Sequence, residues 1–241
     1  ASNGIRILPE KALRRCLALK EVSLPDSLTT IKNSAIERCE SLEEIVLPEG
    51  LEEIESYAFN GCKSLMGIAF PEGLTYLPDR CLISCRSLEE VTLPDSLREI
   101  RGWAFENCES LTVLEIPDGV TAVRSLAFKN AKNLTQLIVP ESVTTLDNDA
   151  ILETNSSSLV MYVVPGSTAE QYAIDHGISY ENLTNTGSAV SVKVTDPDGE
   201  TIANGYSVSW YASDSDTLLG TGKKLRNVQA GTQVVCRVIL L

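Results

Sequence analysis

The chain has 241 residues and a net charge of −13, with 43% hydrophobic and 5% aromatic residues. A site for nucleic acid or for an anionic membrane needs clustered Lys and Arg, so this acidic balance argues against both as partners. The sequence contains no run of about 18 apolar residues, the length needed to span a bilayer. Its first residues, Ala1–Gly4, do not resemble a signal peptide, and we expect that a leader has been removed.

A unit of 23 residues repeats along residues 5–167. Stacked copies can bury the apolar residues that one copy leaves exposed, so the repeat predicts a solenoid. We count positions from the first residue of each unit: positions 1, 4 and 9 are apolar in every copy, and the seventh copy is about two residues longer. The seven copies begin at Ile5, Leu28, Leu51, Leu74, Leu97, Val120 and Val143.

Each unit combines a strand pattern with a compact turn pattern. Residues 42–47 alternate in polarity, which predicts a short strand with Ile45 inward and Glu44 outward, ended by Pro48. The Ala-Phe-x-x-Cys segment at 58–62 predicts a short helical turn. We therefore expect an α/β leucine-rich-repeat solenoid of short strands and short helical turns over residues 1–167.

The full pattern of a unit resembles the BspA-like class of leucine-rich repeats found in bacterial surface proteins. The resemblance covers residues 5–167 and implies a bacterial protein, secreted or attached to the cell surface, with a role in adhesion and host-protein binding. In one unit it is carried by Leu97, Ile100, Ala104, Phe105, Cys108, Leu111, Leu114, Ile116 and Pro117.

The cysteines follow the repeat and do not form a ligand set. Five of the seven occupy position 12, where the sixth unit has Ala131, and Cys81 occupies position 8, where other units have Ala. Since these positions accept alanine, we interpret the cysteines as packing residues. Zinc sites need two closely spaced ligand pairs, so we expect no metal and no cofactor. A disulfide between adjacent units stays open.

Residues 168–183 are expected to form a capping helix and a strand. Ser167 and Glu170 have the spacing of a capping box, and Gly177 marks the helix end. This segment also resembles the usual end of BspA-like arrays. His176 is the only histidine; with no nucleophile near it in sequence, we interpret it as part of the cap and not as a general base.

The remaining sequence, residues 184–241, does not follow the repeat pattern. Residues 184–188 read as a linker, and residues 189–241 as a small all-β second domain, because segments such as 206–211 alternate with period two. This region resembles immunoglobulin-like or prealbumin-like domains of bacterial surface proteins. It is short for a complete sandwich, so we expect it to be truncated.

The sequence predicts no enzyme. It lacks a nucleophile elbow, a phosphate-binding glycine loop and a HExxH motif. Its paired carboxylates, such as Glu43 and Glu44, have counterparts in neighbouring units, as expected of a solvated surface. A catalytic pair would be a local exception to the repeat.

We expect the outward strand positions to bind a protein ligand, from the host or from a bacterial surface. Acidic residues lie toward one end of this face, Gly67 and Ala69 make its middle small and uncharged, and apolar residues lie toward the other end. Two alternatives remain: a structural spacer that displays other domains, and a carbohydrate-binding surface in which Trp103 stacks on sugar. The candidate ligand-binding residues are Glu21, Glu44, Glu90, Thr92, Val113, Glu115, Gln136 and Ile138 on the face, with Tyr57 and Trp103 at position 7.

Overall fold

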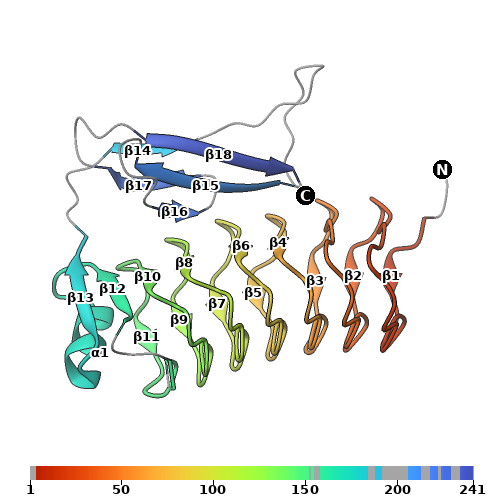
Figure 1. The fold of residues 1–241 in the computed structure, drawn as a ribbon, viewed down its shortest axis with the longest axis horizontal. Helices are drawn as coiled ribbons and strands as arrows, with labels where there is room; N and C mark the ends of the chain where they lie inside the picture. The colour runs from red at the N-terminus through yellow and green to blue at the C-terminus, as the bar shows by residue number, and fades with distance from the viewer. Residues whose placement is uncertain are drawn as a thin grey trace.

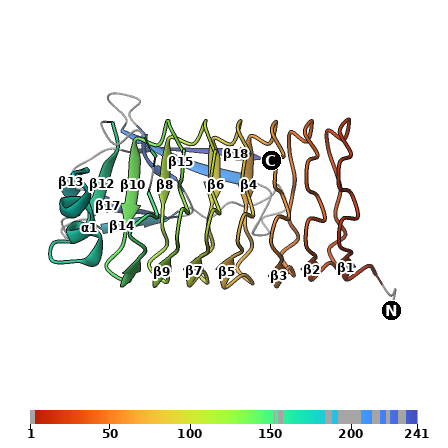
Figure 2. The same cartoon turned by 90° about the horizontal axis from the view of Figure 1, so that it is seen from below.

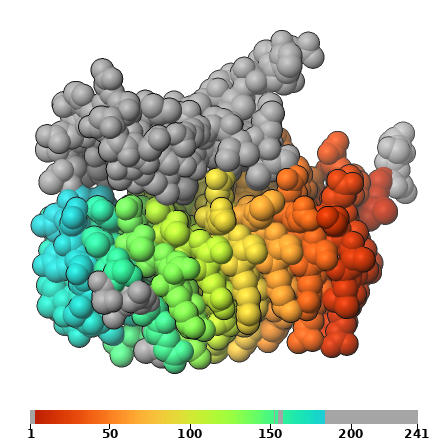
Figure 3. All heavy atoms as spheres, viewed as in Figure 1, coloured from red at the N-terminus to blue at the C-terminus, as the bar shows by residue number. Residues whose placement is uncertain are grey.

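The computed structural model describes residues 4–151, 153–154 and 158–183, and the strand segments 188–191, 206–212, 218–221, 224–228 and 234–240. Side chains are described only up to residue 183. The repeat units form successive coils that stack into an elongated body (Figure 1). In the space-filling view the coils appear as parallel ridges, in chain order (Figure 3). The predicted solenoid is confirmed.

One column of strands runs along the solenoid at positions 3 and 4. Its members pair in parallel at a spacing of one unit, so that Leu8 lies opposite Ile31, and Ile31 opposite Ile54. No strand was predicted at these positions. The strands are β1 (Ile7–Leu8), β2 (Thr30–Ile31), β3 (Glu53–Ile54), β5 (Tyr76–Leu77), β7 (Glu99–Ile100), β9 (Ala122–Val123) and β11 (Thr145–Leu146).

A second column of parallel strands contains the segment predicted from the LxxIxLP pattern (Figure 2). The prediction fails for the first two units, since residues 19–24 and 42–47 lie outside any strand. There the Glu43 N–H still donates to the Lys20 carbonyl at 2.9 Å, but the residues that follow join no ladder. The strands are β4 (Gly67–Ala69), β6 (Glu90–Thr92), β8 (Val113–Glu115), β10 (Gln136–Val139), β12 (Val160–Val163) and β13 (Ser179–Asn182).

The expected helical turns are wrong: the Ala-Phe-x-x-Cys segments are chains of tight turns. In the first six units positions 7 and 11 adopt positive φ, as in Tyr57 (61°) and Gly61 (72°). A right-handed helix cannot continue through a left-handed residue. The Cys62 N–H instead donates to the Phe59 carbonyl at 3.2 Å, and the Phe59 N–H donates to the Cys81 carbonyl of the next coil at 3.0 Å. Hydrogen bonds between coils thus replace those of a helix.

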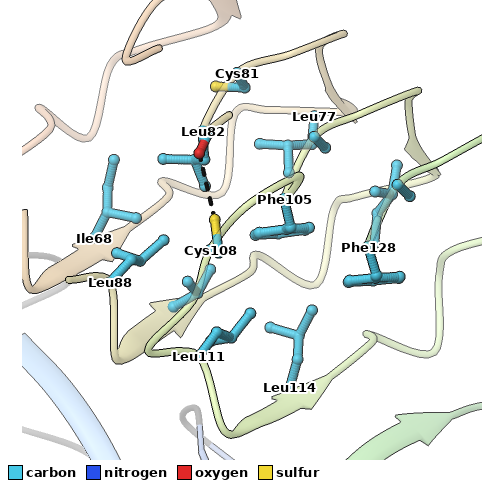
Figure 4. Packing of buried hydrophobic residues seen from close by; sticks show 14 of the residues in the cluster. Ile68, Leu77, Cys81, Leu82, Leu88, Phe105, Cys108, Leu111, Leu114 and Phe128 are labelled. Carbon is cyan, nitrogen blue, oxygen red and sulfur yellow. Dashed lines mark hydrogen bonds between the residues drawn. The ribbon is translucent and has the colours of Figure 1, made fainter. Parts of the chain in front are cut away.

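The recurring apolar positions form one continuous core, as predicted. Position 9 is fully buried in Phe59, Phe105 and Phe128, and the last two rings stack with centroids 5.3 Å apart (Figure 4). The first coil is the exception, because no coil precedes it among the described residues. Its position-1 residue, Ile5, is 64% exposed, whereas Leu28 in the next coil is fully buried.

Helix α1 (Thr168–His176) follows the seventh coil and packs near β11 and β12. Ser167 Oγ accepts the Glu170 N–H at 3.2 Å, as the capping box predicts, while the Glu170 carboxylate accepts from the Gly166 N–H at 2.7 Å. The helix ends at Gly177, with φ of 63°. It buries Tyr172, whose ring stacks on His176 at 4.0 Å. That this helix acts as a cap stays a prediction.

The last strands pair in antiparallel fashion, unlike those of the solenoid. One pair joins β14 and β17, and a three-stranded sheet has the order β16-β15-β18. The domain boundaries and the immunoglobulin-like fold stay predictions, and much of residues 184–241 lies outside the described part of the chain. These strands are β14 (Ser188–Ser191), β15 (Tyr206–Ala212), β16 (Leu218–Thr221), β17 (Lys224–Val228) and β18 (Val234–Leu240).

Candidate functional site

Positions 17 and 19 of the first six units form one wall of the solenoid, which we call the outward strand face. Its residues differ sharply in exposure along the stack. The first two coils expose theirs, the next three bury most of theirs, and the sixth leaves its two half-buried. In order along the stack, the face consists of Glu21, Ser23, Glu44, Val46, Gly67, Ala69, Glu90, Thr92, Val113, Glu115, Gln136 and Ile138.

The exposed end of this face combines carboxylates with apolar area. Glu21 and Glu44 are exposed on adjacent coils, and Val46, on the same coil as Glu44, is 43% exposed. An apolar centre with a polar rim is the usual arrangement of a protein interface. A cavity of about 220 Å³ lies at this end. It is lined by Val22, Ser23, Leu24, Asp26, Val46 and Pro48.

Two of the candidate residues in the middle of the face are buried. Thr92 is 9% exposed and Val113 is 5% exposed, although strand alternation directs both away from the solenoid core. Glu90 and Glu115 flank them and are half-buried. Their role in ligand binding stays a prediction.

The structure brings Tyr57 and Trp103 together, at a site separate from the outward strand face. Both occupy position 7, and Arg80 at the same position lies between them, with its guanidinium carbon 3.9 Å from the Trp103 ring centroid and 5.5 Å from that of Tyr57. Arg80 was not among the residues predicted to bind a ligand. Tyr57, Arg80 and Trp103 occupy position 7 of three successive units, and this order in the sequence could have predicted the stack.

A second cation–aromatic contact lies nearby, where Arg101 stacks over Tyr76 at 3.8 Å. These two residues line a cavity of about 280 Å³ together with Asn33, Glu55, Ser56 and Pro78. Glu55 is engaged there: it accepts from Lys32 at 2.7 Å and from the Asn33 N–H at 2.8 Å. The hydrogen bond from Lys32 is the main cause that lowers the pKa of Glu55.

Carboxylates along the stack pair with cations of neighbouring coils. Glu37 binds Arg14 at 2.8 Å, for example, and Glu99 binds Arg124 at 2.6 Å. Burial raises the pKa of Glu99, but the hydrogen bonds from Arg124 and Arg101 outweigh it and leave that pKa below its ordinary value. Such pairs join adjacent coils. They give a structural role to carboxylates that could otherwise suggest acid–base chemistry.

The cysteines form a ladder of packed thiols. Cys62 and Cys108 are fully buried, as predicted, and burial raises the pKa of both thiols well above the ordinary value. Cys16, in the first coil, is exposed, since no earlier coil covers it in the described part of the chain. The six cysteines with described side chains are all free thiols, so no disulfide joins adjacent coils there.

The described residues contain no cluster of three or more His, Cys, Asp or Glu side chains that could hold a metal ion. Within the same part of the chain, no helix is long and apolar enough to cross a membrane.

The repeat pattern identifies the family. A model of the BspA-type leucine-rich repeat region, with six copies, matches residues 1–112 and 68–169. Together these matches extend over well more than half of the sequence. The chain belongs to the BspA-type leucine-rich repeat family. Its coils, with the Ala-Phe-x-x-Cys turn and the LxxIxLP segment, are BspA-type repeats.

Solved structures of other leucine-rich repeat proteins share the fold. The chain is similar to a leucine-rich repeat protein from Bacteroides ovatus, with 25% identity and a TM-score of 0.62 over 74% of this chain and 49% of that one. It is also similar to the leucine-rich repeat protein of T. pallidum, with 31% identity and a TM-score of 0.61 over 73% of this chain and 79% of that one. The match thus spans about half the length of the Bacteroides protein. No curated protein matches the chain.

Proposed function

We propose that the chain is a non-catalytic protein-binding module of a secreted or surface-exposed bacterial protein. Its ligand is a host or bacterial protein with basic groups, and it contacts the exposed end of the outward strand face. The observation that carries the proposal is the aligned exposure of Glu21, Glu44 and Val46 on two adjacent coils.

The chemistry of this end supports a basic ligand. Glu44 is exposed. Glu43 beside it forms an ion pair with Lys20 at 3.1 Å, and the Glu43 side chain remains 48% exposed. Exposed carboxylates steer an oppositely charged partner by raising the rate of association. Val46 then offers apolar area that a bound protein would remove from water.

The contacts at position 7 make the carbohydrate alternative less well supported. Sugar binding to Trp103 or Tyr57 needs an open ring face, and Arg80 occupies one face of each ring. The spacer alternative predicts no ligand on the outward strand face, so a binding experiment separates it from our proposal.

A photo-crosslinking amino acid at Val46 tests the proposal in the full chain. Glu52, which is exposed at position 2 of the next unit, is the control site because it lies outside the face. We expect one protein from host or bacterial extracts to crosslink from Val46 and not from Glu52. If the two sites give the same products, the proposal is wrong.

The captured protein is then purified and its affinity measured at low and high salt. Glu44→Lys should weaken binding about tenfold and reduce the salt dependence, because a steering carboxylate becomes a repelling cation. Glu52→Lys makes the same change in net charge and should leave the affinity within about twofold. Equal losses for both variants would mean that only the overall charge matters.

A further inference from the structure

Burial along the second strand column does not follow the simple alternation of a sheet with one free face. On β10 and β12 half-buried and buried residues alternate, as expected when one face packs on the core. On β4 all three residues are buried, and on β6 and β8 one outward residue of each strand is buried as well. Something other than the solenoid core therefore covers Ala69, Thr92 and Val113.

The C-terminal strands lie at this place. Cα atoms of β15 come within 8 Å of those of β4 and β6, and β16 comes equally close to β6 and β8. Figures 1 and 2 show β15 alongside this stretch of the solenoid in two perpendicular views. Both strands belong to the antiparallel sheet in which β15 is central. Since neighbours occupy both edges of β15, it can meet the solenoid only with a face of its sheet.

The composition of the covered stretch fits such close packing. Gly67, Ala69 and Thr92 have small side chains, which leave room for Cα atoms of β15 to come within 8 Å of those of β4 and β6.

The same positions of the second coil hold Glu44 and Val46, both exposed. A carboxylate at Gly67 would lose its water beneath β15. The buried positions of the outward strand face, Gly67, Ala69, Thr92 and Val113, thus carry no charge, whereas Glu21 and Glu44 at its exposed end are acidic.

We propose that the outward residues of β4, β6 and β8 are the docking surface for the chain's own strands β15 and β16. These two docked strands, which we call the cover, restrict an outside ligand to the exposed end of the outward strand face. A ligand that binds elsewhere on the face must displace them. This consequence rests on the proposed function, whereas the docking itself does not.

Thiol labelling of the full chain tests the docking without any ligand. The reporter is Thr92→Cys under the cover, and the control is Val46→Cys at the same position of an open coil. The reactive background is removed by Cys16→Ser and Cys236→Ala, while the buried cysteines of the ladder stay. We expect Thr92→Cys to react at least about tenfold more slowly than Val46→Cys, because the reagent reaches it only when the cover opens. Equal rates would overturn the proposal.

A charge placed under the cover provides the second arm. Gly67→Glu introduces a glutamate at the position that Glu44 and Glu90 occupy in the adjacent units. Because its carboxylate would lose water beneath β15, it should raise the labelling rate of Thr92→Cys toward that of Val46→Cys. Gln136→Glu is the matched control at the same position of β10 and should change nothing. Slow labelling that Gly67→Glu does not accelerate would show that the solenoid alone buries the site, and this result also overturns the proposal.

Val113→Cys serves as an independent reporter if Thr92→Cys fails to fold, as judged by its circular dichroism. Failure of the labelling experiment would leave the crosslinking at Val46 unaffected. Failure of the crosslinking would leave the docking of β15 and β16 unaffected.

Discussion

The thiol of Cys108 donates a hydrogen bond to the backbone carbonyl of Leu82 in the preceding coil, with 3.3 Å between sulfur and oxygen (Figure 4). Cys85 makes the same bond to Phe59 at 3.2 Å, and Cys62 to Ile36 at 3.2 Å. Each thiol thus both fills a small space in the core and links two coils. Alanine at the same position in the sixth unit does only the first.

Cys108→Ala should keep the fold and lower the free energy of unfolding by about 1–2 kcal/mol, from a small cavity and one lost hydrogen bond. The cost is limited because the Leu82 carbonyl still accepts the Cys85 N–H at 3.1 Å. Urea unfolding measures the change. Cys16→Ala, at the exposed first rung, is the control and should stay within about 0.5 kcal/mol of wild type. A Cys108→Ala variant as stable as wild type would show that the thiol bond contributes nothing.

Stability should fall at alkaline pH because of the buried thiols. Burial raises the pKa of Cys39 to about 11 from its ordinary 9.0, and it raises the pKa of Cys62 further. Above pH 9 the unfolded chain therefore releases protons that the folded chain keeps. The stabilisation is complete below pH 9 and, for Cys39, is lost as pH rises from 9 to about 11.

Each such thiol steepens the loss by up to about 1.4 kcal/mol per pH unit. Cys62→Ala should accordingly flatten the pH dependence of unfolding between pH 9 and 11, although it is less stable than wild type at pH 7. Chemical unfolding over that range provides the measurement. Parallel curves for the two proteins would contradict the prediction, since other titrating groups are common to both.

Gly61→Ala should destabilise the third coil. Gly61 has φ of 72°, a region that costs alanine about 1–2 kcal/mol. An added Cβ would also lie 3.2 Å from Cγ of Arg38, but that flexible side chain can move. Gly61→Asn is the control, because asparagine tolerates this region and Asn107 already adopts it at the same position. Thermal unfolding should rank wild type above Asn and Asn above Ala; equal midpoints for Asn and Ala would contradict the backbone explanation.

Arg80→Ala should expose Trp103 to water. The guanidinium lies 3.9 Å from the ring centroid, so its removal uncovers one ring face and costs about 0.5–1 kcal/mol of stability. With Trp210→Phe in the background, the emission maximum of Trp103 should shift to the red. Arg80→Lys should give an intermediate shift, since lysine lacks the planar group that stacks. An unchanged spectrum in Arg80→Ala would mean that the stack does not persist in solution.

The sequence predicted the burial of each repeated column because a residue in a stacked coil meets its own counterparts. The repeat length of 23 residues therefore predicts which residues of the adjacent coils lie next to Phe105. The backbone of the turns was not predictable in the same way. Tyr57 and Trp103 adopt positive φ despite their bulk, because hydrogen bonds to the next coil hold them there. No local propensity of an aromatic residue signals that conformation.

The repeat by itself determined the solenoid, its parallel stacking and its apolar core, because stacking in register is the main way to bury an apolar pattern that repeats in every unit. Only the tertiary structure decided which part of the outer wall is open. Thr92 and Val46 occupy the same position of their units, yet one is 9% and the other 43% exposed. The difference comes from strands more than 100 residues farther along the chain, and a period of 23 carries no information about them.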